Sequence, residues 1–183
     1  MILPCLMRPR RKYSILMIML ILLTGKFALP QSSSQVSATG QVLAEIVPVF
    51  TASEASPLNF GKFSPGAQGG KIILTPQGTV ALQGSVTKAP GPFNAASFIV
   101  SGDADAVFSI KLPASPVIIK NIGTSRTMEI ENWMSNPAEG IGTGMLHNGY
   151  QIINIGATLN VGTIQDNPVG IYAGSYNITF EFY

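Results

Sequence analysis

Few side chains in this sequence have the chemistry of a nucleophile, an acid–base group or a metal ligand. The 183 residues include one His and one Cys. His147 stands in a Gly-rich, turn-like segment with no Ser, Cys or metal-ligand cluster near it, so we interpret it as a solvated loop side chain. Cys5 precedes the apolar N-terminal run, whereas a lipid-carrying Cys would follow it. One His and one Cys are too few for a metal centre or a disulfide framework.

The acidic and Gly-rich motifs also have structural interpretations. Glu129 and Glu131 share one face of a predicted strand, whereas an acid–base pair needs two different environments. Asp103 and Asp105 lack the further oxygen ligands of a calcium loop. Residues 140–144 resemble a phosphate-binding loop, but no helical pattern follows them, so they predict a linker between strands. We therefore expect no cofactor, no metal and no enzymatic activity.

The composition indicates one globular domain rich in turns. Apolar residues make up 46% and charged residues only 11%, which excludes a disordered acidic or basic tail. The 19 Gly and 13 Pro residues fit many short strands better than long helices. A chain of this length normally forms one domain.

The first 34 residues have the layout of a secretory signal peptide. A basic start is followed by an apolar run over residues 15–23 and by a polar exit that ends at Ser34. The alternative is a membrane anchor, but the run is shorter than the roughly 20 residues that span a bilayer. We expect cleavage within residues 30–38 and export to the periplasm, the cell surface or the medium. Contact with the membrane would then occur only during export.

Removal of this segment reverses the sign of the net charge. Five of the 11 basic residues and none of the nine acidic residues lie in residues 1–34, which leaves a formal charge of about −3. Nucleic-acid binding requires a basic patch that neutralises phosphates. We therefore expect no nucleic-acid partner for the mature chain, residues 35–183.

The residue pattern of the mature chain predicts a series of short strands. Thr127, Glu129 and Glu131 alternate with Met128 and Ile130, which places polar and apolar side chains on opposite faces of a strand. Trp133 lies on the same alternating stretch and is interpreted as a core residue. Turn signals rich in Gly and Pro separate the segments. The predicted strands cover residues 42–49, 58–63, 71–75, 79–87, 97–101, 108–112, 116–120, 124–136, 153–161 and 172–183. This pattern predicts an all-β, antiparallel sandwich of about eight to ten strands.

The last predicted strand, residues 172–183, has one aromatic and aliphatic face and one polar face. The apolar face carries Tyr172, Tyr176, Ile178, Phe180 and Phe182. It is either a final core strand or an edge placed to pair with another chain, because a sheet edge presents unpaired backbone groups.

Five segments in order resemble a known secreted bacterial family. They are LNFGKFSPG (58–66), FIVSG (98–102), FSIKLP (108–113), GATLNVG (156–162) and GIYAGSY (170–176). The chain from about Ala38 to Tyr183 thus resembles the domain of unknown function 4402. That family is similar to Mat (common-pilus) fimbrial major subunits and to spore coat U-like proteins.

The resemblance implies an immunoglobulin-like, pilin-like sandwich assembled by a periplasmic chaperone and an outer-membrane usher. Chaperone–usher pilins typically carry a penultimate aromatic residue and a Gly fourteen residues from the end, and Phe182 and Gly170 stand at these positions. The disulfide of the classical pilins is absent, because the only Cys is Cys5.

Two functions remain open at this point. The first is a non-enzymatic fimbrial or surface-coat subunit that self-assembles by β-strand addition. Its acceptor edge would include Gly170, Tyr172, Tyr176, Ile178, Phe180 and Phe182. Its donor strand would lie in residues 35–50, beginning with Val36, Ala38 and Gly40, whose side chains are small. The alternative is a monomeric secreted sandwich for adhesion or ligand binding.

We predict that the exported protein begins within residues 31–38, because the basic, apolar and polar segments together direct cleavage there. Mass spectrometry of the envelope and secreted fractions measures the N-terminus. Recovery of a membrane-embedded chain that still contains Met1 or Cys5 would refute the signal peptide.

Overall fold

Strands are the only regular elements in the part of the chain that the structure describes. The structure is a computed structural model and describes residues 34–46 and 49–183. The predicted signal-peptide residues 1–33 lie outside it. The strands are β1 (Thr51–Ser56), β2 (Phe63–Leu74), β3 (Val80–Lys88), β4 (Ala96–Ser101), β5 (Val107–Lys111), β6 (Val117–Asn121), β7 (Thr127–Asn136), β8 (Gly140–Met145), β9 (Tyr150–Val161), β10 (Tyr172–Ala173) and β11 (Thr179–Phe182).

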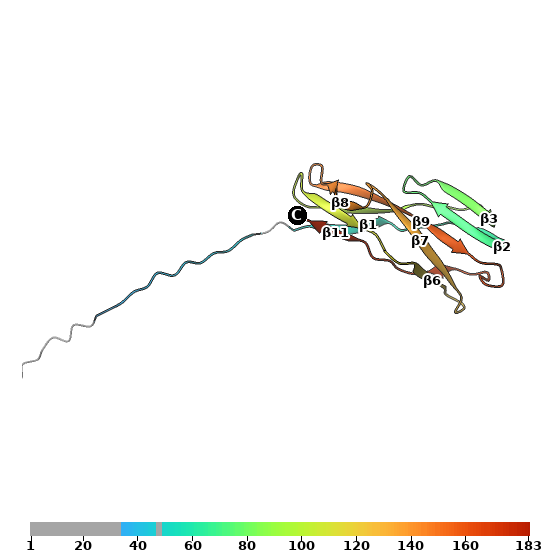
Figure 1. Ribbon diagram of the computed structural model, residues 1–183, viewed down its shortest axis with the longest axis horizontal. Helices are drawn as coiled ribbons and strands as arrows, with labels where there is room; N and C mark the ends of the chain where they lie inside the picture. The colour runs from blue at the N-terminus through green and yellow to red at the C-terminus, as the bar shows by residue number, and fades with distance from the viewer. Residues whose placement is uncertain (1–33, 47–48) are drawn as a thin grey trace, which may run out of the picture. The chain divides into compact units, whose positions relative to one another are not determined.

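The chain divides into two units, Met1–Ala44 and Glu45–Tyr183. Residues 34–44 of the first unit are exposed and form no strand. The second unit is an antiparallel, immunoglobulin-like β-sandwich, as predicted, with one strand more than the predicted upper bound (Figure 1). No helix able to cross a membrane occurs within residues 34–46 and 49–183.

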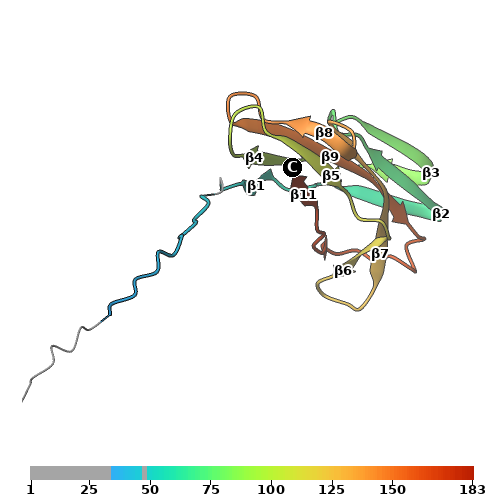
Figure 2. The ribbon, with the colours of Figure 1, turned by 60° about the vertical axis from the view of Figure 1, so that its left-hand side comes forward.

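The two sheets of the sandwich differ greatly in size. The large sheet has eight strands, in the order β1-β4-β9-β7-β6-β10, with the β2–β3 hairpin attached to β9. The small sheet has three strands, in the order β11-β5-β8. The end of the large sheet formed by β6 and β7 therefore extends beyond the small sheet (Figure 2).

Strand β9 organises the large sheet. One edge of β9 pairs with β7, and the other pairs first with β4 and then with β2. Its inward side chains Ile153, Ile155 and Leu159 are almost completely buried. Period-two alternation brings these residues to one face, and their burial is the main driving force for the sandwich.

The core confirms several sequence predictions. Met128 and Ile130 are buried on β7, whereas Thr127 and Glu129 on its other face are exposed. Trp133 is 9% exposed and belongs to the core. Phe108 of β5 is fully buried and packs against Gly144 of β8, where a Cβ atom would collide with the Phe108 ring.

Four local predictions were wrong. Residues 42–46 form no strand, because no neighbouring backbone pairs with them. Residues 58–62 form only a bridge between Asn59 and Asn94, and β2 begins later. Residues 140–144 are not a linker, because β8 pairs with β5 there. The predicted last strand is divided into β10 and β11, since residues 174–178 pass from one sheet to the other without pairing. Strand β1 was not predicted.

We predict that Ile153→Ala destabilises the domain by about 2–5 kcal/mol, because truncation of a fully buried Ile removes apolar contacts and leaves a cavity. The adjacent Ile152 faces outward and is 51% exposed, so Ile152→Ala is the matched control and should stay within about 0.5 kcal/mol. Urea unfolding followed by circular dichroism measures both. An equal loss of unfolding free energy in the two variants would contradict the inward position of Ile153 and the outward position of Ile152 on β9.

Candidate docking groove

An apolar groove lies on the part of the large sheet that the small sheet does not cover. Its volume is about 510 Å³. The floor is made by the inward side chains of β6, β7 and β9, namely Val117, Ile119, Met128, Ile130 and Leu159. One wall is the segment 58–65 and the other is the segment 168–176. The groove thus occupies a place where a further strand of the second layer would lie.

The floor follows from strand alternation. Val117 pairs with Ile130, and Ile130 pairs with Leu159, so one apolar row crosses β6, β7 and β9. Ile119 pairs with Met128 in the next row. Met128 and Ile130 are each 5% exposed because the two walls shield them, whereas Val117 and Ile119 are half-buried.

Strand pairing covers only part of each wall. The backbone of residues 58–62 is held by the Asn59–Asn94 bridge and by the Ala89 N–H that donates to the Lys62 carbonyl at 2.9 Å. In the opposite wall, β10 pairs with β6 over two residues only. Residues 63–65 of the first wall also pair with β3, and the Ile122 N–H donates to the Ile171 carbonyl of the second wall at 2.9 Å, so backbone pairing holds part of each wall.

The C-terminal strand presents a free backbone edge. Among the described residues, the backbone groups of 174–178 form no hydrogen bond with another backbone group. Directly after β11, the Tyr183 N–H donates to the Val107 carbonyl at 3.4 Å. Antiparallel pairing alternates, so the backbone groups of Phe180 and Phe182 point to the opposite, unpaired edge. An added strand would find donors and acceptors along this edge.

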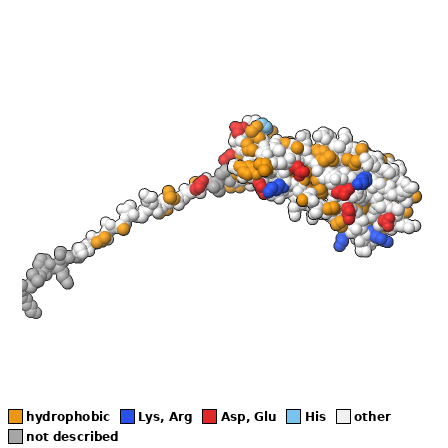
Figure 3. Space-filling view, viewed as in Figure 1, with side chains coloured by type: hydrophobic (Ala, Val, Ile, Leu, Met, Phe, Trp, Pro, Cys, Tyr) orange, Lys and Arg blue, Asp and Glu red, His pale blue; other side chains and the backbone are white. Residues whose placement is uncertain are grey.

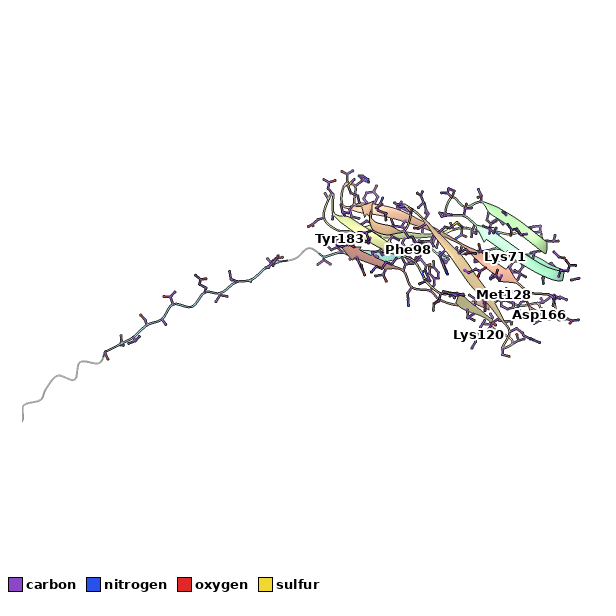
Figure 4. The ribbon with its side chains drawn as sticks, viewed as in Figure 1. Lys71, Phe98, Lys120, Met128, Asp166 and Tyr183 are labelled. Atoms are coloured by element: carbon purple, nitrogen blue, oxygen red, sulfur yellow. The ribbon has the colours of Figure 1, made fainter. Side chains whose placement is uncertain are left out.

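The aromatic side chains of the C-terminal strand pack on the core beyond the groove. The ring centroid of Phe180 lies 5.9 Å from that of Phe108 and 6.3 Å from that of Phe98. Phe182 stacks on Phe50 at 3.7 Å. Phe98 lies towards the end that holds Tyr183, whereas Met128 lies towards the end that holds Lys120 and Asp166 (Figure 4). The aromatic cluster and the groove floor are therefore successive parts of one interior.

Tyr176 joins these two regions. Its ring centroid lies 4.7 Å from that of Trp133, and its side chain lines the groove. Its hydroxyl is buried without a hydrogen-bond partner, and this burial raises the pKa of Tyr176 above its ordinary value. The phenol is therefore neutral at physiological pH.

The residues predicted to form the acceptor edge lie in two different parts of the domain. Gly170, Tyr172 and Tyr176 line the groove. A Cβ atom at Gly170 would collide with the Asn121 amide, which donates to the Pro168 carbonyl, so this Gly lets the wall approach β6. Ile178, Phe180 and Phe182 pack on the core outside the groove lining.

The predicted donor residues Val36, Ala38 and Gly40 are exposed and form no strand. Sequence reasoning also missed part of the groove itself, namely Leu58, Phe60 and Phe63 in one wall and Val117 and Ile119 in the floor. The alternation of Val117 and Ile119 on a short strand was the available signal.

The groove offers little chemistry beyond apolar contact. Its ionisable lining groups are Lys62, Tyr172 and Tyr176, and the Tyr172 hydroxyl donates to the Pro168 carbonyl at 2.9 Å. No group of three or more His, Cys, Asp or Glu side chains suited to a metal occurs in the described ranges. Glu131 lies on the outer face, where hydrogen bonds from Lys71, at 3.0 Å, and from Asn160 lower the pKa of its carboxyl.

Comparison with known proteins identifies a family for the folded part of the chain. No curated protein and no solved structure matches the chain. A family model described as "Domain of unknown function (DUF4402)" matches residues 50–182, which contain the sandwich, the groove and the free edge. The chain therefore belongs to the DUF4402 family.

Proposed function

We propose that this protein is an exported, non-enzymatic structural subunit of a fimbrial or surface-coat assembly, joined to its neighbours by β-strand addition. The groove of about 510 Å³ on the uncovered part of the large sheet is the observation that carries the proposal. Strand addition requires backbone groups that are free to pair and pockets for alternate side chains. The edge of residues 174–182 supplies the first requirement, and the floor on β6, β7 and β9 supplies the second.

The partner in this proposal is a second copy of the chain. Its donor strand lies in the N-terminal stretch 35–50, which includes Val36, Ala38 and Gly40. An apolar groove exposed before assembly favours aggregation. We therefore also propose that a periplasmic chaperone covers the groove and that an usher exchanges the chaperone for the donor strand. Segment 1–34 would direct the export that this route requires.

A binding role fits the groove better than catalysis does. Acid–base or nucleophilic catalysis needs groups within hydrogen-bond reach of each other and of a substrate. The lining offers one Lys and two Tyr side chains among apolar ones. The mostly apolar lining therefore favours binding of an apolar partner.

A second candidate is a monomeric module for adhesion or ligand binding. The groove volume of about 510 Å³ lies in the range of small-molecule pockets, roughly 300–1,000 Å³, which are also mostly apolar. A small ligand would leave the free backbone edge of residues 174–178 unpaired, whereas a strand would pair with it. The edge therefore favours strand addition.

We predict that Ile171→Asp lowers the multimer fraction about tenfold or more. Ile171 lines the groove and is 68% exposed, so the domain should still fold. A docked strand would bury the new carboxylate, at a cost above the ~1.4 kcal/mol that corresponds to a factor of ten. Size-exclusion chromatography and SDS-resistance of protein recovered from the cell envelope measure multimers.

Ile122→Asp is the matched control. Ile122 is 71% exposed and its N–H donates to the Ile171 carbonyl, but its side chain is not part of the groove lining. We expect its multimer fraction to equal that of the unmodified protein. An unmodified protein that is always monomeric would refute the proposed function and favour the monomeric module.

A further inference from the structure

A second, open hollow lies on the outer face of the large sheet. Its volume is about 790 Å³. It lies over the first residues of β7 and the last residues of β9, between the β6–β7 turn and the loop that follows β9. Basic and acidic side chains lie close together over this end of the sandwich, on the right in Figure 3, and Figure 4 places Lys71 and Asp166 there. The outer hollow therefore differs from the apolar groove in both position and chemistry.

Strand alternation builds the floor of the outer hollow. Met128 faces the core, so the neighbouring Glu129 faces outward. By the same alternation, Asn160 faces outward between the buried residues Leu159 and Val161. Glu129 and Asn160 pair directly across β7 and β9. The floor thus carries a carboxylate and an amide side by side.

Hydrogen bonds fix the loop that forms one wall. The Gly162 N–H donates to the side-chain oxygen of Asn167, and the Asn167 amide donates to the Thr127 carbonyl at 2.8 Å. The Asp166 carboxylate accepts hydrogen bonds from the Thr163 N–H at 3.1 Å and from the Thr163 hydroxyl at 2.7 Å. The loop is therefore tied to β7 before any ligand binds, and it holds the Asp166 carboxylate at the rim.

The lining contains donors and acceptors that other residues leave unpaired. The Arg126 guanidinium, in the wall made by the β6–β7 turn, forms no ion pair with any residue that the structure describes. The hydrogen bonds from Thr163, helped by the nearby charge of Arg126, lower the pKa of the Asp166 carboxyl, so this group is ionised at neutral pH. The side-chain oxygen of Asn160 is buried and has no hydrogen-bond partner in the described ranges. A hydroxyl group bound at the floor would supply a donor for it.

These groups restrict the class of ligand. Two carboxylates, Glu129 and Asp166, and one guanidinium, Arg126, give the lining a formal charge of −1, which disfavours phosphate and carboxylate ligands. The guanidinium disfavours a compact cation, and the polar lining disfavours an apolar molecule. A neutral polyhydroxylated molecule fits, because each hydroxyl can donate to a carboxylate and accept from a guanidinium.

We infer that this outer hollow, lined by Arg126, Glu129, Asn160 and Asp166, binds a neutral saccharide. The inference goes beyond the proposed function and does not depend on it, because the groove floor uses inward side chains of β7 and β9 whereas the hollow uses outward ones. Among the lining residues there is no aromatic ring, so a single hollow binds through hydrogen bonds. If the copies assemble as proposed, many such sites act together at a high effective concentration, which strengthens attachment.

Titration with soluble oligosaccharides tests the inference. The probes are neutral oligosaccharides of glucose, mannose, galactose and N-acetylglucosamine, with oligogalacturonate as the anionic probe and oligolysine as the basic peptide probe. We expect at least one neutral series to bind the exported protein in the millimolar range or tighter, as measured by isothermal titration calorimetry. We expect oligogalacturonate not to bind, because Glu129 and Asp166 repel it.

Two substitutions and two matched controls locate the site. Arg126→Gln removes the charged donor and Glu129→Gln removes a carboxylate, and both side chains are exposed, so the domain should still fold, as circular dichroism would check. We expect each to weaken saccharide binding about tenfold or more, because hydrogen bonds to charged groups are the stronger ones. Lys120→Gln and Glu139→Gln make the same charge changes at exposed side chains outside the hollow and should bind as the unmodified protein does.

Three results would overturn the inference. The first is that no neutral oligosaccharide of the set binds. The second is that binding is unchanged in Arg126→Gln and Glu129→Gln, or falls equally in the two controls. The third is that oligolysine binds and the saccharides do not, which would assign the hollow to a basic peptide. A monomeric protein that binds a saccharide in this way would refute the proposed assembly and leave the outer hollow as assigned.

Discussion

The unequal size of the two sheets is the constraint on which the rest of this structure depends. The large sheet has eight strands and the small sheet three, so the small sheet cannot cover the whole inner face. Apolar side chains such as Met128 and Ile130 are buried only because the walls 58–65 and 168–176 lie over them. Burial of such side chains stabilises a sandwich by about 25 cal/mol per Å². The groove is the part of the inner face where this cover is incomplete.

The same constraint explains why the C-terminal segment changes sheets. Residues 172–173 pair with β6 in the large sheet, and residues 179–182 pair with β5 in the small one. The residues between them cross from one layer to the other and therefore lack backbone partners. Their side chains still follow the strand alternation, so Tyr176 and Ile178 pack on the core while Ser175 and Asn177 are exposed. An apolar face and a free edge thus occur in one segment.

Much of the fold could be predicted from the local pattern of apolar, polar and turn residues in the sequence. The alternation over residues 127–131 of β7 predicted that Met128 and Ile130 are buried, and the turn signals separated β3, β4, β5 and β6 within one or two residues of their observed bounds. The predictions failed where pairing, and not side-chain pattern, defines the strand. Residues 42–46 alternate but form no strand, whereas Gly140–Met145 has weak side-chain signals but pairs with β5.

The sequence by itself determined the all-β class, the inward faces of most strands, the small supply of catalytic side chains and the membership of residues 50–182 in one family. These properties depend on residue types and on spacings within a few residues. Only the tertiary structure decided that the second layer has three strands, that Val117, Ile130 and Leu159 form one floor, and that residues 174–178 are unpaired. These features depend on contacts between residues far apart in the chain, and the local period of two is the same whether or not a partner strand is present.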